Sequence, residues 1–206
     1  MLGISQRYSF SYVTSGPKVN ATRDTGYLKP QSIQKMSDDF EVIEQLGKEG
    51  AQGVVYLVEF PNGLRAAMKA FKKTKSPARI QAEADFQSRA AEAGIAPEVM
   101  HVDLDKKRIF MEVMQSRIVD VLKQGTDYFS QDLLHIMRTL DDIDILHNDG
   151  NALNLMLNDR DQLQIIDFGL SKEITPKVRK KWQGEPNIRV TLHMLRKGLL
   201  KYKITA

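Results

Sequence analysis

The sequence predicts an α+β fold of two small lobes, with a small antiparallel sheet in the first lobe and mostly helices in the second. Short apolar strands joined by glycine-containing turns follow one another from residue 40, and one of these turns is Asn62-Gly63. Segments with apolar residues at helical spacing come mainly later in the chain. With 206 residues, 42% of them hydrophobic, the chain can bury a substantial core.

Changes in composition divide the chain into three parts. Residues 1–38 have no sustained apolar period and are predicted to form a flexible arm. Residues 39–114 carry the strands, the last of them predicted over 108–113, and one helix. Residues 115–206 carry a predicted short helix over 116–123, a longer helix that begins at Ser130, a final helix with apolar residues from 188 to 199, and a basic ending. No apolar run is long enough for a membrane span, and the lack of cysteine excludes disulfides and thiolate metal sites.

Positive charge gathers at the end of the sequence. Residues 172–206 contain ten Lys or Arg against Glu173 and Glu185, a formal charge of +8 in a chain whose net charge is +4. Such a segment could contact nucleic acid, an anionic membrane or an acidic protein. Aromatic residues that would stack on bases scarcely interleave with the charges. We therefore expect no nucleic-acid binding, and a solvated face or a protein contact instead.

A glycine-rich turn joins the first two predicted strands. Gly47, Gly50 and Gly53 lie between a polar strand near 40–46 and an apolar strand at 54–58. Glycines let backbone N–H groups approach anionic oxygens without a Cβ in the way. The turn is therefore a candidate phosphate-binding loop, although an ordinary glycine-rich hairpin has the same pattern.

The third predicted strand carries a single lysine, Lys69, among small and apolar neighbours. An inward-facing lysine is costly there unless it meets an anion, so we expect it to contact nucleotide phosphate and a carboxylate. Residues 76–94 form a predicted helix, with Pro in its first turn and Gly at its end. Glu83 on this helix is the expected partner. The alternatives are Glu92 as the partner, and a surface position for Lys69.

The stretch 147–169 holds the strongest chemical pattern. Asp149 is followed five residues later by Asn154, and an apolar strand then leads to Asp-Phe-Gly at 167–169. In phosphoryl transfer one Asp can accept a hydroxyl proton, while an Asn and a second Asp hold Mg²⁺ on the nucleotide phosphates. Asp149 is therefore the candidate base, and Asn154 and Asp167 are the candidate metal ligands. A polar turn between two strands is the alternative.

Taken in order, these motifs resemble the eukaryotic-type protein kinase fold across about residues 40–170. The resemblance rests on the glycine loop, Ala67-Met68-Lys69, Glu83, the hinge Glu112–Met114, His147-x-Asp149, Asn154 and Asp167-Phe168-Gly169. It implies a minimal two-lobed kinase that uses ATP and Mg²⁺. It also places Lys69, held by Glu83, at the α- and β-phosphates. The residues that it implies at the nucleotide, besides Lys69 and the loop glycines, are Val55, Met111, Glu112 and Met114.

The sequence also departs from the family pattern. Asn148 stands where many kinases carry the Arg that grips a phosphorylated activation loop, and Asn151 replaces a Lys two residues after the catalytic Asp. The glycine loop has one extra residue between Gly47 and Gly50. No Ala-Pro-Glu motif follows Gly169. A truncated second lobe without the usual peptide platform is therefore expected.

The short second lobe, the Ser-rich arm, the lack of cysteine and the basic ending resemble the minimal kinases that bacterial type III secretion injects into host cells, and the HopBF family in particular. That resemblance implies a monomeric serine/threonine kinase that acts in the host cytoplasm on heat-shock protein 90, with residues 1–38 as a candidate secretion signal. Two other classes stay open. Asn148 and Asn151 favour a small-molecule phosphotransferase of the aminoglycoside or choline type, and a nucleotide-binding pseudokinase could serve as an interaction module.

Overall fold

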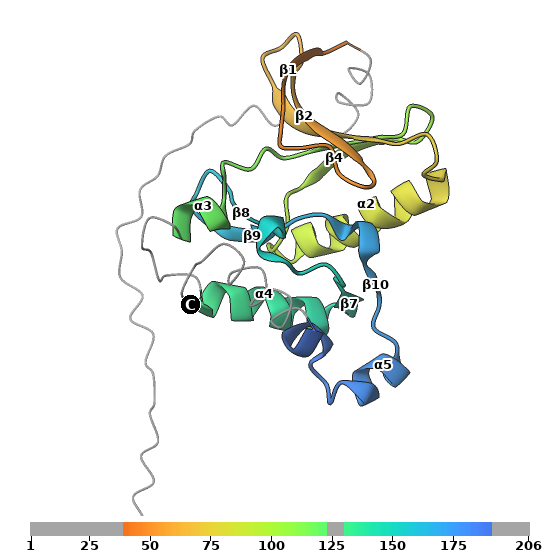
Figure 1. Cartoon of the computed structure of the whole chain (residues 1–206), viewed down its shortest axis with the longest axis vertical. Coiled ribbons are helices and arrows are strands. Elements are labelled where there is room, and N and C mark those ends of the chain that lie inside the picture. The colour runs from red at the N-terminus through yellow and green to blue at the C-terminus, as the bar shows by residue number, and fades with distance from the viewer. Residues whose placement is uncertain (1–38, 123–129, 191–206) are drawn as a thin grey trace, which may run out of the picture.

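The structure has two lobes, which lie one above the other in Figure 1. The upper lobe holds a five-stranded sheet, and the lower lobe holds most of the helices and two short strand groups. This computed structural model describes residues 39–122 and 130–190. The predicted flexible arm at 1–38 and most of the predicted final helix lie outside the described residues.

The upper sheet is antiparallel throughout. Its strands are β1 (Glu41–Gln45), β2 (Gly53–Glu59), β3 (Arg65–Phe71), β4 (Val99–Asp103) and β5 (Arg108–Met111), and they lie in the order β1-β2-β3-β5-β4. The predicted Asn-Gly turn joins β2 to β3, and Gly63 has a positive φ of 80° in it. Tight hairpins of this kind are available only to antiparallel neighbours.

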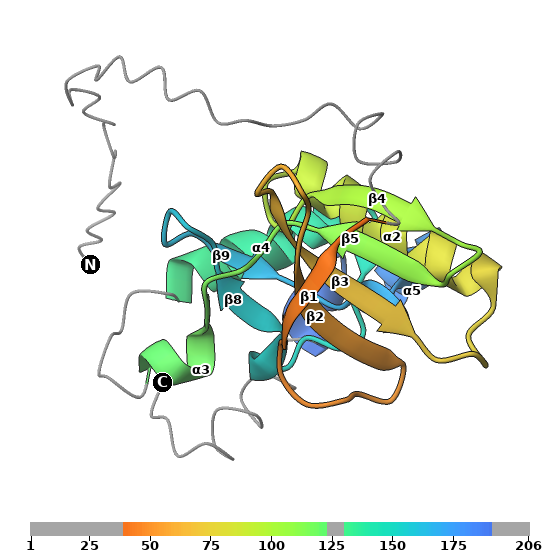
Figure 2. The same cartoon turned by 90° about the horizontal axis from the view of Figure 1, so that it is seen from above.

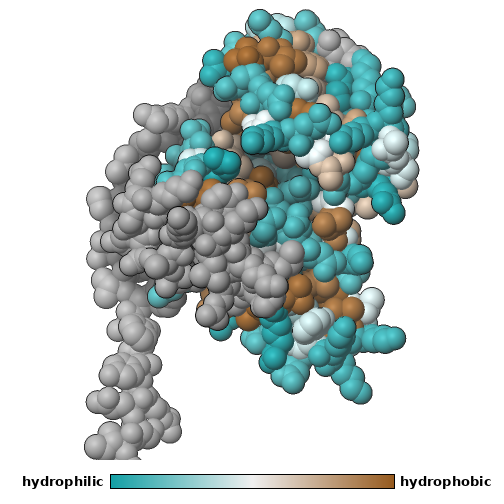
Figure 3. Space-filling model, in the orientation of Figure 1, coloured by the Kyte–Doolittle hydropathy of each residue, from teal (hydrophilic) through white to brown (hydrophobic). Residues whose placement is uncertain are grey.

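The two faces of this sheet bury different groups. One face carries the side chains of three cross-strand neighbours, Val55 on β2, Lys69 on β3 and Ile109 on β5. On this face Ile109 packs against the helix below the sheet. On the other face the rings of Phe40 and Phe110 pack edge-on, 5.6 Å apart between centroids. Hydrophobic surface (brown) appears over this lobe at the top of Figure 3.

Helix α2 (Pro77–Glu92) lies beneath the sheet and packs on both lobes (Figure 1). Ser76 caps its first turn by accepting a hydrogen bond from the N–H of Arg79. Gly94 follows the helix with a positive φ of 77°. The predicted helix over 76–94 is therefore confirmed. Its buried face carries Ile80, Glu83, Ala84, Gln87 and Ala90.

The lower lobe is built from short elements. They are β6 (Ser116–Arg117), α3 (Ile118–Leu122), α4 (Ser130–Asp142), β7 (Ile145–Leu146), the 3₁₀ turn η1 (Ala152–Asn154), β8 (Leu155–Leu157), β9 (Leu163–Ile165), the 3₁₀ turn η2 (Phe168–Leu170), β10 (Lys172–Glu173) and α5 (Pro176–Lys181). Residues 186–190 are helical as well. A helix was predicted from residue 116, but it begins at 118 because residues 116–117 pair with β8.

The connection between the lobes leaves the upper sheet earlier than the apolar pattern predicted. Strand β5 ends at Met111, whereas a strand to Val113 was expected. The N–H of Glu112 still bonds an upper-lobe carbonyl, that of Glu98 (3.0 Å), but the N–H of Gln115 bonds the carbonyl of Leu157 in the lower lobe (2.8 Å). The chain changes partners between these residues, which makes them the hinge.

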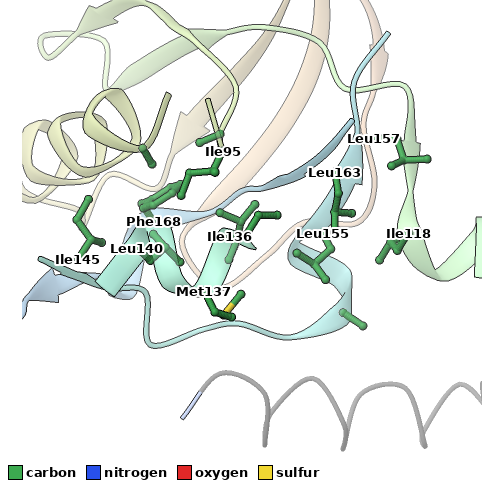
Figure 4. Close-up of a cluster of buried hydrophobic side chains, with 14 of the residues drawn as sticks. Ile95, Ile118, Ile136, Met137, Leu140, Ile145, Leu155, Leu157, Leu163 and Phe168 are labelled. Atoms are coloured by element: carbon green, nitrogen blue, oxygen red, sulfur yellow. The ribbon is translucent and has the colours of Figure 1, made fainter. Parts of the chain in front are cut away.

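One hydrophobic core fills the lower lobe and extends to the end of α2 (Figure 4). Ile136, Met137 and Leu140 of α4 are fully buried in it, together with Phe168. Ile95, which follows α2, packs into the same cluster. Burying one side chain of this size contributes about 1.5–3 kcal/mol. The core therefore holds the end of α2 firmly against the lower lobe.

A small antiparallel sheet above a lobe of short helices and strands confirms the predicted two-lobed α+β fold. Seen from above, the sheet lies over α2 and the lower lobe (Figure 2). No helix within 39–122 or 130–190 is long and apolar enough to cross a membrane.

Candidate active site

Lys69 of β3 joins three parts of the structure. Its Nζ donates hydrogen bonds to Oε1 of Glu83 on α2 (2.5 Å) and to Oδ1 of Asp167 in the lower lobe (2.8 Å). Burial alone would lower the pKa of Lys69, but the carboxylates of Asp167 and Glu83 outweigh burial and raise that pKa. Lys69 is therefore charged at neutral pH, and the predicted contact between Lys69 and Glu83 is present.

Glu83 is shared between two lysines. Its side chain is 2% exposed, and its Oε2 lies 3.3 Å from Nζ of Lys75, which precedes α2. Two neighbouring cations offset the cost of burying the carboxylate. Glu92, the competing candidate, is exposed on the last turn of α2. No sequence pattern singled out Lys75, because it stands among other lysines in a polar connection.

The glycine loop between β1 and β2 lies close against β3. A Cβ on Gly53 would come within 2.2 Å of the carbonyl oxygen of Ala70, so only glycine fits there. Gly47 has a positive φ of 85°, and the N–H of Gly50 bonds the carbonyl of Gly53 (2.9 Å). The loop is therefore narrow and carries no side chain at these three positions, as a loop over phosphates requires.

The tip of this loop touches the lower lobe through Gln52, a residue without a sequence signal of its own. Its Oε1 accepts a hydrogen bond from Nζ of Lys75. A Cβ on Gly169 would lie 2.4 Å from the same oxygen, so Gln52 packs where Gly169 has no side chain. A continuous chain of polar contacts thus runs from the loop tip through Lys75 and Glu83 to Lys69.

The expected adenine position combines the inner sheet face with the hinge. Val55 and Met111 belong to one apolar cluster, which also includes the hinge residue Val113. The carboxylate of Glu112 turns away and accepts a hydrogen bond from the backbone N–H of Glu98, the residue before β4 begins (3.4 Å). Within the described part of the chain, nothing bonds the carbonyl of Glu112 or the N–H of Met114. These backbone groups could therefore pair with the edge of a base.

Asparagine side chains hold both carboxylate oxygens of Asp149. Nδ2 of Asn154 donates to the carbonyl oxygen of Asp149 (2.8 Å) and to its Oδ2 (3.1 Å). Nδ2 of Asn151 donates to Oδ1 (3.0 Å), while Oδ1 of Asn151 accepts the N–H of Leu153 and caps η1. The asparagine found in place of the expected lysine therefore orients the candidate base.

His147 is fully buried behind this loop and is held in one tautomer. Its Nδ1 accepts the N–H of Asp149 (3.3 Å), so Nε2 carries the proton and donates it to the carbonyl of Ile166 (3.1 Å). Burial lowers the pKa of His147 to about 4, so the ring is neutral at pH 7. The ring also packs edge-on against Phe168. His147 thus fixes Asp149 relative to the strand that leads to Asp167.

Asn187, in the helix at 186–190, anchors the same loop from the far side. It is fully buried, and its Oδ1 accepts the N–H of His147 (3.0 Å). Its Nδ2 donates to Oδ1 of Asp141 (2.7 Å) and to the carbonyl of Ile145 (2.6 Å). Sequence spacing gave no hint of this role, because these partners lie 40 to 46 residues earlier in the chain.

Two polar residues of the site have left-handed backbone conformations, which Asn and Asp tolerate better than most residues. They are Asp167 (φ 65°) and Asn148 (φ 63°). Burial alone would raise the pKa of Asp167, but the charge of Lys69 and the bonds from Lys69 and the N–H of Gly169 hold it below its usual range. Nδ2 of Asn148 donates to the carbonyl of Leu170 (3.2 Å). This bond ties the segment that carries Asp149 to the segment that carries Asp167.

The remaining oxygens suit a divalent cation. Because the amide nitrogen of Asn154 faces Asp149, its Oδ1 faces the other way and accepts no bond from another described residue. Oδ2 of Asp167 is equally free of partners among the described residues. Mg²⁺ prefers such oxygens and usually keeps waters and phosphate oxygens as its other ligands. No cluster of three or more Asp, Glu or His within 39–122 and 130–190 could hold a metal by itself. The donor set therefore fits Mg²⁺ bound together with a nucleotide.

The order and placement of these parts define a protein-kinase-like fold with two lobes. Sequence comparison reaches the same class independently, since residues 40–190 match the protein kinase domain. The chain belongs to this family.

Individual relatives are distant. The chain is similar to mitogen-activated protein kinase 2 of Pneumocystis carinii, with 26% identity over 199 residues that cover 80% of this chain and 54% of the relative. Mitogen-activated protein kinase kinase 7 of Arabidopsis thaliana is 27% identical over 164 residues, which cover 68% of this chain and 49% of the relative. The chain spans about half the length of these two relatives. The chain is also similar to a probable bifunctional tRNA threonylcarbamoyladenosine biosynthesis protein of Methanocaldococcus jannaschii, with 36% identity over 96 residues. This match covers 46% of this chain and 17% of the relative.

Proposed function

We propose that this protein is an ATP- and Mg²⁺-dependent serine/threonine protein kinase. The observation that carries the proposal is the contact of Lys69 with both Glu83 and Asp167, because it brings the phosphate-binding and metal-binding segments together. The N–H of Ile166 also bonds the carbonyl of Asn154 (2.9 Å). This bond sets Asp167, the residue after Ile166, beside Asn154, the other candidate metal ligand. The matched protein kinases support a protein as the acceptor.

Each residue then has a physical role. Lys69, kept charged and oriented by Glu83, fixes the α- and β-phosphates. Asn154 and Asp167 hold Mg²⁺, which when bound neutralises charge on the phosphate oxygens. Asp149 orients the acceptor hydroxyl and accepts its proton. This reaction depends mainly on positioning and charge neutralisation, which is what the fixed geometry supplies.

We further propose a monomeric effector of the HopBF type, secreted by a bacterium into the host cytoplasm through type III secretion, with heat-shock protein 90 as its substrate. This part rests on the sequence resemblance. Two features of the site are in keeping with a specialised kinase, namely Asn151 as the support of Asp149 and Asn148 as a neutral link to Leu170. Docking of a folded substrate can supply orientation that a short groove does not.

Purified protein incubated with γ-labelled ATP, Mg²⁺ and a eukaryotic lysate tests the class of acceptor. We expect label on a protein band near ninety kilodaltons and on purified heat-shock protein 90, and no label with the Asp149→Ala variant. Label on other proteins but not on this chaperone would keep the kinase and overturn the HopBF-type substrate.

Two other outcomes would point to the alternative classes. Label on an aminoglycoside or choline, and on no protein, would identify a small-molecule phosphotransferase. Nucleotide binding without transfer to any acceptor would identify a pseudokinase.

A further inference from the structure

A cationic cavity lies beside the candidate active site, between the tip of the glycine loop and the start of α2. Its volume is about 410 Å³. Of the nine residues that line it, three are cations, namely Lys72, Lys75 and Arg79, and none is an acid. The cavity therefore favours an anion over a cation or an apolar group.

The three cations differ in how far their charge is compensated. Lys75 is 10% exposed and already pairs with Glu83. Lys72 lies 3.2 Å from Glu49, but both side chains are largely exposed (44% and 60%), so this pair is weak. Arg79 forms no ion pair with another described residue. Positive charge is therefore left over, and most of it belongs to Arg79.

The surroundings of Arg79 add to this preference. Arg79 stands in the first turn of α2, a 16-residue helix whose N-terminal end points partial positive charge at the same place. The hydroxyl groups of Thr74 and Ser76 also line the cavity. A guanidinium group can bind a carboxylate or a phosphate through two parallel hydrogen bonds. The cavity thus offers both charge and hydrogen-bond donors to one anionic group.

The position of the cavity suggests which molecule carries that group. Gly169 and Leu170 line it, and they come two and three residues after Asp167, which meets Lys69. The cavity-lining Leu170 accepts a hydrogen bond from Asn148, the residue before Asp149 (3.2 Å). An extended protein chain advances by about 3.3 Å per residue, so residues close to an acceptor hydroxyl at Asp149 can reach the cavity. The nucleotide phosphates are assigned to Lys69, which does not line the cavity.

We propose that this cavity binds an anionic side chain of the protein substrate, a carboxylate or a phosphate, close to the acceptor hydroxyl. The cavity then sets a preference for acidic or already phosphorylated sequences. This inference rests on the proposed kinase function and adds a specificity site to it.

A peptide series tests the inference. Each peptide has one acceptor serine in the same neutral sequence, and one flanking position carries alanine, aspartate, glutamate or phosphoserine. That position moves from four residues before the serine to four residues after it. At one or more positions we expect kcat/KM to be about tenfold higher for an acidic peptide than for the alanine peptide, as hydrogen bonds between charged groups typically give.

Variants then assign the preference to the cavity. Arg79→Ala should reduce the acidic-to-alanine ratio of kcat/KM to near one. Lys73→Ala is the matched control, because Lys73 is an exposed lysine of the same connection that does not line the cavity, and it should keep the ratio. A higher ratio for phosphoserine than for aspartate identifies phosphate as the preferred group, and equal ratios identify any anion of this size.

The results that would overturn this inference differ from the result that would overturn the proposed kinase function. Equal kcat/KM for acidic and alanine peptides at every position would overturn the inference, as would label on intact proteins but on no peptide. Only the absence of transfer to every protein and peptide would overturn the kinase function itself.

Discussion

The side-chain amide of Asn151 donates a hydrogen bond to Oδ1 of Asp149 over 3.0 Å, while its oxygen accepts the N–H of Leu153. One neutral side chain thus orients the candidate base and caps the following turn. The sequence presents Asn151 as a departure from the protein kinase pattern. In the structure it supports Asp149 directly.

Asn151→Asp separates these two tasks, because it keeps an oxygen that can cap η1 but replaces the donor with a second carboxylate beside Asp149. We expect kcat to fall about tenfold or more, since a misplaced general base forfeits much of its usual contribution, with little change in KM for ATP. Steady-state kinetics measure both. Asn151→Ala removes both tasks and should also lower the midpoint of thermal unfolding. An unchanged kcat in Asn151→Asp would contradict the orienting role.

Replacing the two aspartates should have different effects on nucleotide binding. Asp167→Ala removes the carboxylate expected to bind the metal, so we expect both transfer and the thermal shift induced by Mg²⁺-ATP to be lost. Asp149→Ala removes proton acceptance, so transfer should be lost while the thermal shift persists. Equal loss of the shift in both variants would show that the division of roles is wrong.

Glu83→Gln leaves the buried Lys69 and the partly buried Lys75 with one carboxylate fewer between them. Breaking a buried charge pair from one side typically costs about 3–5 kcal/mol, so we expect a loss of stability on this scale in urea unfolding, together with a fall in kcat/KM. Glu92→Gln on the same helix is the control, because Glu92 is exposed, and its effect should stay within about 0.5 kcal/mol. Similar results for the two variants would contradict the importance assigned to Glu83.

Acid should destabilise the fold through His147 in a defined pH window. The ordinary pKa of 6.5 falls to about 4 in the folded protein, so between these values the unfolded chain binds a proton that the folded chain does not. The contribution of neutral His147 is therefore complete above pH 6.5 and is lost as pH falls toward 4, at up to about 1.4 kcal/mol per pH unit.

Urea unfolding at pH 7.5, 5.5 and 4.5 measures this slope. His147→Gln should flatten it, whereas His135→Gln should keep it because His135 is exposed on α4. The depressed pKa of Asp167 adds a separate loss of stability at lower pH, as that carboxylate becomes protonated. An equal slope in all three proteins would contradict the assignment to His147.

Activity should not require prior phosphorylation of the enzyme. The side chain of Asn148 is committed to the carbonyl of Leu170 and cannot make the two-pronged phosphate contact that Arg makes. Phosphatase treatment of the purified enzyme should therefore leave its rate unchanged. A large drop in rate after treatment would reveal a phosphorylation switch.

Local signals explain why much of the fold could be predicted. Helix α2 is marked by its cap Ser76, by Pro77 and by Gly94, all within one short stretch. The contact of Lys69 with Glu83 follows from the cost of a lone inward-facing lysine. The end of β5 was mispredicted because apolar residues continue past it as Val113 and Met114, so hydrophobicity alone did not show where the chain changes partners.

Other parts of the site left no trace in the sequence. Gln52 reaches Gly169 and Asn187 reaches His147 only after folding, across long separations and with residue types that are common on any surface. Lys75 is one lysine among several in a polar connection, and only its burial against Glu83 distinguishes it. Contacts of this kind depend on tertiary packing rather than on a local pattern.

Asp149 is proposed to act as the base in phosphoryl transfer to a protein. The rate of label transfer from γ-labelled ATP to protein serine by the wild-type protein and by Asp149→Asn, which keeps the side-chain shape, measures this role. We expect Mg²⁺-dependent transfer by the wild type, and transfer at least about 100-fold slower by the variant with an unchanged nucleotide-induced thermal shift. Transfer by Asp149→Asn at the wild-type rate would show that Asp149 is not the base, and no transfer by a wild-type protein that binds Mg²⁺-ATP would show that the protein is not a kinase.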